Sequence, residues 1–398
     1  MFYVGIDIGK NTHVASVIDQ EGTPCLHGFS FSNSLKGIQS LLNRLFQLAD
    51  SPESFRIGLE ATGHYWSSVY SYLDDHSFTQ YVINPIQTDG WRKGTEIRRR
   101  KTDKIDSLLI AELIRHGEFV ETLMTEEQLY SLKQYTRYRN YQRSQASDYK
   151  RKIIAVLDQI FPEYARVFKG NGLFSVTSLQ LLQECPSPQE VDEWTTEDLT
   201  DFINRASRMR LGPERARKKA TDLKEVSTES LGVTFGLESF IFQLHSMIEQ
   251  LQFFESQIQE TEKKIEELMN QLDSVITTIT GIGPITGATI LGELGDIRRF
   301  SSPKQIVAYA GLDPSVSQSG EFEATQNAMS KRGSPHLRKA LFQAAIVACA
   351  HDPVLKAFYE KKRSEGKHHL TAVGAVARKM CHIIYAVLQK NEPYEIRK

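Results

Sequence analysis

The 398-residue sequence contains few cysteines, and they form no recognisable pair. None belongs to a C-x-x-C motif or has a histidine at zinc-finger spacing, and they lie far apart at Cys25, Cys185, Cys349 and Cys381. This scatter excludes a disulfide framework and a cysteine-based zinc site, and it is typical of a protein in a reducing cytosol.

A long apolar run and a signal peptide are also lacking. The longest apolar stretch, around Ala344–Ala350, is much shorter than the roughly 20 residues that cross a bilayer. The N-terminal residues MFYVGIDIGK have no basic segment followed by a long apolar one. We therefore expect a soluble, cytoplasmic protein with no membrane partner.

Net charge is nearly absent as well. Forty-eight lysines and arginines oppose 49 aspartates and glutamates, so the chain lacks the basic excess that usually marks a nucleic-acid-binding protein. The charge is nevertheless segregated: basic residues gather near 91–104, 136–152, 205–219 and 331–339, and glutamates near 249–267. A hydrophobic content of 40% excludes wholesale disorder, and the length suggests two or three domains.

Strand and helix patterns alternate over the first hundred residues. We expect helices at Leu35–Leu48 and Tyr65–Leu73, and strands at Phe2–Ile8, Thr12–Asp19, Cys25–Ser32, Phe55–Glu60 and Gln80–Ile83. Three consecutive strands followed by helix-linked strands predict a mixed α/β sheet.

Helical patterns dominate after about residue 103. The patterns predict helices at Asp103–His116 and Glu126–Leu157, an irregular polar segment at 170–235, and an α-rich domain at 273–398. A heptad seam from Ile241 to Leu272 predicts a coiled-coil-like helix, although Glu255 and Glu262 interrupt it. A single helix packed on its own domain would explain the same seam.

Four carboxylates stand where a metal site can form. Asp7 ends the first expected strand and Glu60 the fourth, while Asp103 and Asp106 are three residues apart and share one helix face. Converging carboxylates repel one another, and Mg²⁺ or Mn²⁺ relieves that repulsion. Each acid alone has an ordinary alternative, as a turn former or a solvated helix start.

Two segments in the last third of the chain offer backbone amides or hydroxyls that could serve a function. Ile276–Gly295 is typical of a helix-hairpin-helix, in which Gly281 and Gly283 let backbone N–H groups approach a phosphate. The loop 315–320 offers three hydroxyls, with no histidine or acid at a fixed spacing that would activate one. A structural helix connection and loop solvation are the ordinary alternatives.

Cations and tyrosines alternate along the long helix at Glu126–Leu157. Arginines supply affinity for phosphates, and tyrosines stack on unpaired bases. A solvated face with core aromatics fits the same pattern, which comprises Arg137, Arg139 and Arg143 with Tyr135, Tyr138, Tyr141 and Tyr149.

Four short motifs resemble those of one transposase family. They are Gly5–Lys10 (GIDIGK), Leu59–Tyr65 (LEATGHY), Ile83–Pro85 (INP) and Arg100–Ser107 (RKTDKIDS). In order and spacing they are similar to the DEDD insertion-sequence transposases of the IS110 family, whose first domain looks like the RuvC resolvase. Actin-like sugar kinases also open with a strand and Asp-x-Gly, but their glycine-rich phosphate loops are missing here.

The resemblance assigns roles to the acids and to one serine. It implies a RuvC or RNase H-like domain in which Asp7, Glu60, Asp103 and Asp106 bind Mg²⁺ or Mn²⁺ and act in catalysis. The family commonly has alanine where this chain has Ser107. The run from Ile276 to about Tyr394 is similar to the family's second domain, whose nucleophilic serine matches Ser319, with Ser317 as the nearest rival.

The resemblance also implies partners. These are target DNA, donor DNA, a structured noncoding guide RNA (a bridge RNA) and further copies of the chain, as a dimer or tetramer, near the nucleoid of a prokaryotic cell. The residues expected to contact nucleic acid are Arg98, Arg99, Arg100, Lys101, Arg137, Arg139, Arg143, Gly281, Gly283, Lys331, Arg332 and Arg338.

Together these expectations describe an α/β plus all-α enzyme. We expect a RuvC-like catalytic domain at 1–118, a helical, coiled-coil-like connector at 119–272 and a serine transposase domain with a helix-hairpin-helix at 273–398. The function expected is RNA-guided DNA recombination through a covalent phosphoserine. The alternatives are a metal-dependent junction endonuclease that hydrolyses DNA and a nucleic-acid scaffold with an inactive tetrad.

Overall fold

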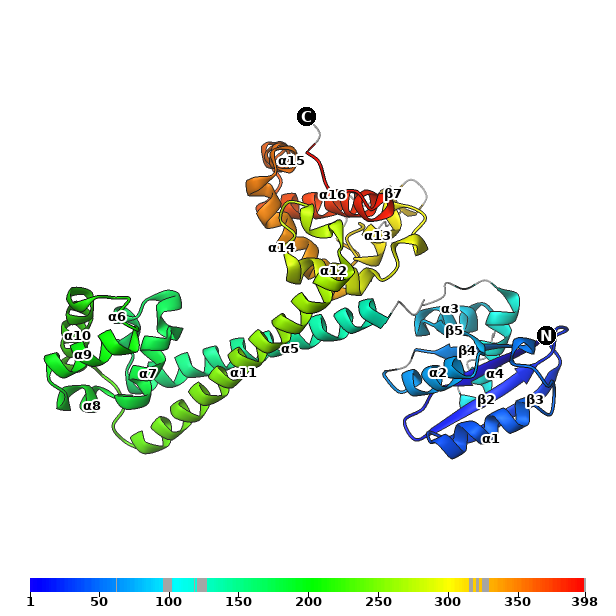
Figure 1. The fold of residues 1–398 in the computed structure, drawn as a ribbon, viewed down its shortest axis with the longest axis horizontal. Helices are drawn as coiled ribbons and strands as arrows, with labels where there is room; N and C mark the ends of the chain where they lie inside the picture. Colours follow the sequence, from blue (N-terminus) through cyan, green and yellow to red (C-terminus); the bar gives the residue numbers. More distant parts are fainter. Residues whose placement is uncertain are drawn as a thin grey trace. The chain divides into compact units, whose positions relative to one another are not determined.

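The computed structural model of the chain describes residues 1–61, 63–95, 102–117, 119, 127–314, 318–319, 322–323 and 329–396. The chain divides into two compact units, Met1–Thr125 and Glu126–Lys398 (Figure 1). The three-domain division expected from the sequence stays a prediction.

The first unit is built on a five-stranded mixed sheet. Its strands are ordered β3-β2-β1-β4-β5, with β1–β2 and β2–β3 antiparallel and β1–β4 and β4–β5 parallel. The mixed α/β prediction is therefore confirmed. The strands are β1 (Phe2–Asp7), β2 (Thr12–Ile18), β3 (Pro24–Ser32), β4 (Phe55–Glu60) and β5 (Thr79–Ile83).

Helices cover both faces of this sheet. Apolar side chains of one face, including Ile6 and Leu59, pack with those of α1 and α2. On the other face α4 packs directly on β1: a Cβ atom added at Gly5 would lie 2.0 Å from the carbonyl oxygen of Ser107. The helices are α1 (Leu35–Leu45), η1 (Pro52–Ser54), α2 (Trp66–Asp75), α3 (Pro85–Thr95) and α4 (Asp103–His116).

The boundaries of α4 match those predicted from the sequence. The Thr102 side chain accepts a hydrogen bond from the Ile105 N–H, which caps the N-terminus of the helix. Gly117 ends it with φ 74°, a left-handed conformation that glycine adopts without strain.

The second unit is organised around two long helices, α5 (Glu127–Ile160) and α11 (Leu237–Leu272). They run antiparallel, because Arg139 pairs with Glu262 whereas Lys150, further along α5, pairs with Glu255. The heptad seam of α11 thus packs on a helix of the same chain. Its two interrupting glutamates are the residues that form these ion pairs.

Between these two helices the chain forms a compact helical lobe. The prediction that 170–235 is irregular was wrong, because short apolar stripes here belong to helices with side-chain caps such as the Ser187–Glu190 capping box. The lobe comprises α6 (Tyr164–Val167), η2 (Gly170–Phe174), α7 (Val176–Glu184), α8 (Pro188–Glu193), α9 (Thr196–Ala206) and α10 (Pro213–Thr228).

The two ends of the lobe meet. The Val233 N–H donates to the Gln159 carbonyl oxygen at 2.9 Å. A Cβ atom added at Gly232 would lie 1.9 Å from the Ile160 carbonyl oxygen, so only glycine fits there. The lobe has its own core, which also includes residues of α5 and α11 such as Ile153 and Leu251.

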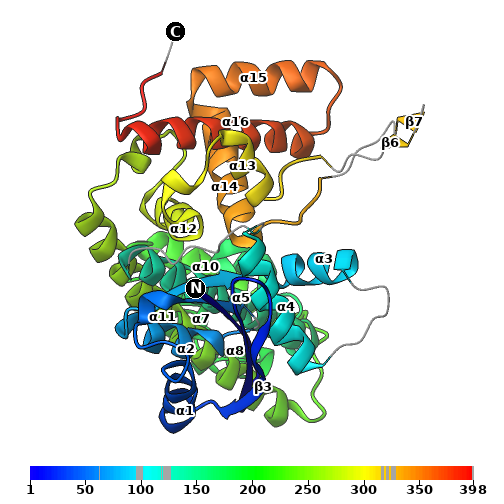
Figure 2. The same ribbon diagram turned by 90° about the vertical axis from the view of Figure 1, so that its right-hand side faces the viewer.

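The rest of the second unit is an α-rich assembly with a separate core (Figure 2). A Cβ atom added at Gly281, which has φ 92°, would lie 2.4 Å from the Ala344 carbonyl oxygen. The elements are η3 (Val275–Thr278), α12 (Pro284–Leu294), η4 (Ile297–Arg299), α13 (Pro303–Tyr309), β6 (Gln318–Ser319), β7 (Phe322–Glu323), α14 (Pro335–His351), α15 (Pro353–Ser364) and α16 (His369–Lys390).

Two features of this region concern the expected helix-hairpin-helix and the most apolar helix. A short 3-10 helix, η3, precedes α12 where a helix-hairpin-helix would need a longer helix, so that motif is not confirmed. Among the described residues α16 is apolar and long enough to cross a membrane, but half of its apolar window is buried inside the protein. Buried residues such as Val376 and Met380 make it a core helix.

Candidate functional site

The first two acids of the tetrad lie at the ends of neighbouring parallel strands. Ile6 is paired with Leu59 in the ladder, so Asp7 and Glu60 follow at the same edge of the sheet. Gly5 and Gly58 face α4, and side chains alternate between the faces of a strand. Asp7 and Glu60 therefore share the α4 face, and both are half-buried.

The other two acids lie in the first turn of α4. Asp103 is exposed, whereas Asp106 is buried. Negative side chains are favoured there by the helix dipole. Because α4 packs on β1, all four acids belong to the α4 side of the sheet.

The helix α3 supplies partners to two of these acids. Nη2 of Arg92 lies 2.9 Å from Oδ1 of Asp106, and only 16% of the arginine side chain is exposed. The Thr88 hydroxyl donates to the Glu60 carboxylate. Sequence analysis placed Arg92 in a basic run but gave no sign that its side chain turns inward.

The fit of a divalent metal to this edge is partial. Four carboxylates are the hard oxygen donors that Mg²⁺ and Mn²⁺ prefer. Among the side chains that the structure describes, however, no three histidines, cysteines or acids form a group that could hold a metal. The backbone brings the acids to one edge, while the Arg92 guanidinium stands at Asp106 as a positive charge.

Ser107, the departure from the family pattern, is accommodated by a second serine. Its buried hydroxyl lies 2.8 Å from the Ser16 hydroxyl of β2. Ser16 also accepts a hydrogen bond from the Gly28 N–H at 3.0 Å. The polar group is therefore satisfied in the interior and ties α4 to β2 and β3.

Ser319 lies in a small hairpin. It belongs to β6 and is paired with Phe322 of β7. The side chain of Ser319 and the whole of Ser317 lie outside the described residues. The structure therefore gives the backbone position of the expected nucleophile.

The base of the Ser319 loop is firmly held. Pro314 and Met329 form a β-bridge, and the Ser330 N–H and hydroxyl donate to the carbonyl and carboxylate of Asp313 at 2.9 and 2.5 Å. A Cβ atom added at Gly333 would lie 2.0 Å from the Tyr309 carbonyl oxygen. These contacts fix both ends of the loop between 315 and 328.

A buried carboxylate that the sequence analysis missed supports this region. Glu293 of α12 has a fully buried side chain that accepts two hydrogen bonds from Arg137, at 2.6 and 3.0 Å, and one from Ser334 at 2.8 Å. Burial alone would raise the pKa of Glu293, but the Arg137 contacts hold it below its usual value. The sequence did contain one sign of this buried carboxylate, because Glu293 is an acid within the apolar run Ile276–Gly295.

The residues expected to bind nucleic acid have different positions. Arg98, Arg99, Arg100 and Lys101 lie outside the described residues. Arg137 is paired with Glu293, and Arg139 and Arg143 with Glu262. Lys331 and Arg332 are exposed, Arg338 donates to the Ala310 carbonyl, Gly281 packs on α14 and Gly283 caps α12.

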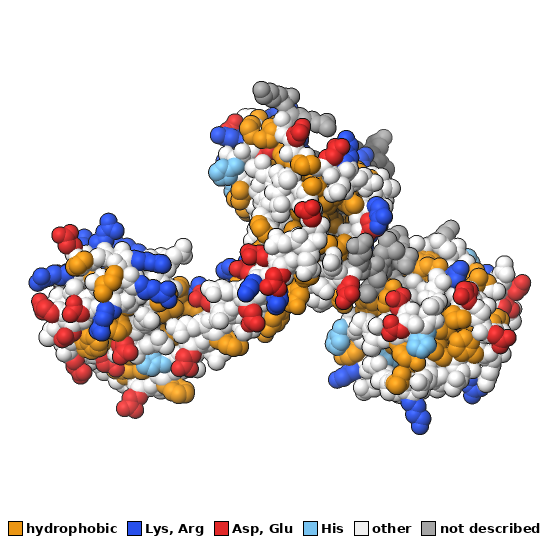
Figure 3. All heavy atoms as spheres, viewed as in Figure 1, with side chains coloured by type: hydrophobic (Ala, Val, Ile, Leu, Met, Phe, Trp, Pro, Cys, Tyr) orange, Lys and Arg blue, Asp and Glu red, His pale blue; other side chains and the backbone are white. Residues whose placement is uncertain are grey.

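Basic side chains also gather on the helical lobe, where Figure 3 shows many lysines and arginines. The exposed members in the α9–α10 region are Arg205, Arg208, Arg210, Arg215, Arg217 and Lys218. Arg208 and Met209 adopt positive φ angles of 54° and 60° in the turn between these helices. Such strained backbone is more common at functional sites.

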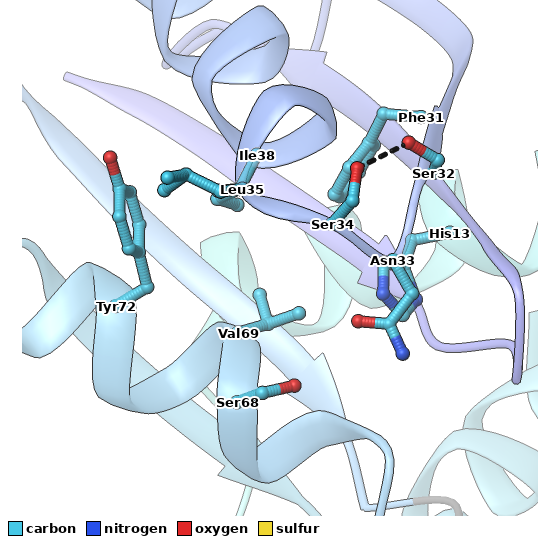
Figure 4. Close-up of a pocket in the computed structure, with 10 residues that line it drawn as sticks. All are labelled: His13, Phe31, Ser32, Asn33, Ser34, Leu35, Ile38, Ser68, Val69 and Tyr72. Carbon is cyan, nitrogen blue, oxygen red and sulfur yellow. Dashed lines mark hydrogen bonds between the residues drawn. The ribbon is translucent and has the colours of Figure 1, made fainter.

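A cavity of about 290 Å³ lies on the sheet face opposite the acids (Figure 4). It is lined by residues of β2, β3, α1 and α2, such as His13 and Val69, and by Asn33 between β3 and α1. Burial lowers the pKa of His13 below its usual value, and Asn33 opposes this effect. His13 is therefore neutral near pH 7 and belongs to the packed face of the sheet.

Comparison with protein families gives two matches. A model described as a transposase matches residues 4–162. A second model, described as the transposase IS116/IS110/IS902 family, matches residues 273–360. The first match contains all four acids, and the second contains Ser319 and Glu293.

Two individual relatives are similar along nearly the whole chain, and a third over part of it. A pilin gene-inverting protein of Moraxella bovis is 26% identical over 396 residues, covering 99% of this chain and 98% of the relative. A mini-circle putative transposase for IS117 from Streptomyces coelicolor is 24% identical over 405 residues, covering 99% and 95%. The transposase for insertion sequence element IS1111A of Coxiella burnetii is 31% identical over 122 residues, 30% of this chain and 33% of that protein.

Proposed function

Because the chain belongs to the IS116/IS110/IS902 family of transposases, we propose that it recombines DNA through a phosphoserine intermediate, assisted by a divalent metal at its four acids. The observation that carries the metal proposal is the placement of Asp7 and Glu60 on one face, at the ends of adjacent parallel strands. The full-length likeness to a pilin gene-inverting protein supports rearrangement of DNA.

The proposed chemistry is a reversible exchange of phosphodiester bonds. The Ser319 oxygen forms a bond to a DNA phosphorus atom, and the bond from that phosphorus to one deoxyribose oxygen breaks. The serine proton is lost and the departing deoxyribose oxygen gains one. Attack by another DNA hydroxyl on the phosphoserine reverses the step, so no hydrolysis is needed to rejoin the strands.

Several groups of this chain would support that exchange. Asp7, Glu60, Asp103 and Asp106 would hold Mg²⁺ or Mn²⁺, which when bound supplies charge stabilisation at a phosphate. The clamp formed by Asp313, Ser330 and Gly333 keeps the ends of the Ser319 loop in place.

We also propose a structured noncoding guide RNA and an oligomer as partners. The exposed arginines of the α9–α10 region offer a phosphate-binding surface that needs no base contacts. Base pairing within the RNA–DNA hybrid would then supply the sequence specificity.

The first prediction tests the nucleophile. Purified protein, the noncoding RNA that flanks its gene, Mg²⁺ and DNA are incubated, and covalent protein–DNA adducts are measured on denaturing gels. We expect Ser319→Ala to abolish the adduct while RNA binding is retained, because only the Ser319 oxygen forms the bond to phosphorus. Ser317→Ala, from the same loop, is the matched control and should retain the adduct.

Three other outcomes discriminate between the alternatives. DNA cleavage that survives Ser319→Ala would show hydrolysis by a junction endonuclease in place of recombination. A full yield of adduct in Asp7→Asn and Glu60→Gln variants would contradict a role for the acids. The same yield without RNA would contradict guidance by RNA.

A further inference from the structure

A groove of about 710 Å³ runs along the C-terminal assembly beside the Ser319 loop. One wall is a face of α14 whose lining residues recur every three to four positions, such as Arg338, Phe342 and Ile346. The other wall belongs to α16. Pro314 and Met329, the β-bridge that closes the Ser319 loop, line one part of the groove.

The charged side chains that the structure describes in this groove have one sign. Among the described residues four cations line it, Lys331, Arg338, Lys339 and Arg378, and no aspartate or glutamate does. Like charges repel, so the groove favours an anionic occupant. Arg338 is already oriented, because its Nη1 donates to the Ala310 carbonyl at 3.0 Å, and a guanidinium carries five N–H donors in all.

The floor of the groove is apolar and contains one aromatic ring. Phe342 is half-buried, and Ile346 and Leu370 beside it are 49% and 57% exposed. Gly374 of α16 leaves room for the tip of this ring, because a Cβ atom there would lie 3.3 Å from Cζ of Phe342. An aromatic ring bordered by cations is the arrangement that holds unpaired nucleotides, since the base stacks and the phosphate pairs.

We propose that this groove binds one unpaired nucleotide of a DNA strand, with its base on Phe342 and its phosphates at Arg338, Lys339 and Arg378. The choice of DNA over another polyanion rests on the proposed function. Pro314 and Met329, which line the groove, flank the segment that carries the expected nucleophile, so an unpaired nucleotide held here would restrict the position of the neighbouring phosphate.

The test separates binding of a base from attraction to phosphates. A fluorescein-labelled oligothymidylate is compared with an abasic deoxyribose-phosphate strand of equal length, in the full chain carrying Ser319→Ala. We expect the thymidylate to bind more tightly. Phe342→Leu, which keeps an apolar floor, should reduce this preference by about fivefold or more, the loss of one stacked base.

Further variants distinguish loss of base binding from misfolding and from a general effect of charge. Gly374→Ala should also lower the base preference, because its methyl would crowd the Phe342 ring in a helix that tolerates alanine. Arg378→Ala should lower the slope of log affinity against log salt by about 0.7. Lys379→Ala is the matched control, since Lys379 packs over the Phe358 ring at 4.6 Å and does not line the groove.

Three results would overturn the proposal. The first is an undiminished base preference in both Phe342→Leu and Gly374→Ala, and the second is an equal loss of affinity in Lys379→Ala. The third is that oligouridylate binds more tightly than oligothymidylate and that only the binding of oligouridylate depends on Phe342. That result would make the groove an RNA site. Because covalent chemistry is absent from the assay, failure of Ser319 as a nucleophile leaves the result unaffected.

Discussion

A single guanidinium decides the electrostatics at the proposed metal edge. Arg92 is mostly buried beside Asp106, whose own side chain is 10% exposed. A cation that approaches Asp106 must share the carboxylate with Arg92 or displace it. The arginine therefore lowers the affinity for a metal ion below the value that the four acids alone would give.

Removal of this charge should tighten metal binding. We expect Arg92→Met, which keeps most of the stem, to raise the affinity for Mn²⁺ by about three- to tenfold, or about 1 kcal/mol, because a competing positive charge is lost. Titration calorimetry measures the affinity. Lys93→Met is the control, since the exposed Lys93 is paired with Asp89. Weaker binding in Arg92→Met would show that Arg92 orients Asp106 for the metal.

His13 should make the first unit sensitive to acid. Its folded-state pKa lies below the roughly 6.5 of an unfolded chain. The unfolded state therefore binds more protons, so the stability contribution is present above pH 6.5 and is lost as pH falls towards the folded-state value. The slope is at most about 1.4 kcal/mol per pH unit.

The free energy of unfolding is measured in urea between pH 7 and 5, and hydrogen exchange of peptides from β2 and β3 monitors the unfolding of the first unit. His13→Phe, placed beside Phe31, should flatten the loss of stability below pH 6.5. His27→Phe changes an exposed histidine and should leave the slope unchanged. A wild-type slope equal to that of His13→Phe would contradict this account.

At the scale of elements, the junction of α5, α12 and α14 depends on one ion pair. Glu293 is fully buried, whereas the Arg137 side chain is 43% exposed. We expect Arg137→Met to destabilise the second unit by about 3 kcal/mol, because it leaves a buried charge without its partner. Glu293→Gln keeps hydrogen-bonding capacity and should cost less.

A double-mutant cycle identifies the cause. The Arg137→Met, Glu293→Gln double variant should be more stable than the sum of the single effects predicts, because no unpaired carboxylate remains. Urea unfolding gives the free energies. Additive effects, together with a loss of DNA binding in Arg137→Met alone, would instead make Arg137 a nucleic-acid contact.

Some elements were predictable because their signals are local. The α4 helix begins at a threonine cap and ends at a left-handed glycine, and both signals are visible in the sequence. The strands of the first unit follow from short apolar or alternating runs. The helix that packs on the α11 seam was not predictable. Glu255 and Glu262 form ion pairs with Lys150 and Arg139, which lie more than a hundred residues away in the sequence.

At the scale of the whole molecule, net charge was a poor guide to partners. The total of −1 includes acids that form internal ion pairs, such as Glu262 and Glu293. It also includes cations of a groove whose described lining residues contain no acid. The candidate acids were identified by motif and order. Arg92, Glu293 and the Phe342 groove were not, because each depends on which way a side chain points after folding.

The closed ends of the helical lobe have a consequence for how this chain can change. The lobe leaves α5 and returns to α11 at nearly one point, where Val233 meets Gln159. Because the two ends of the lobe are adjacent, the size of the lobe can vary, or a short turn can replace it. The register of α5 and α11 is preserved in both cases. The length of sequence between the four candidate acids and the candidate serine can thus change without any shift at either end of the helical pair.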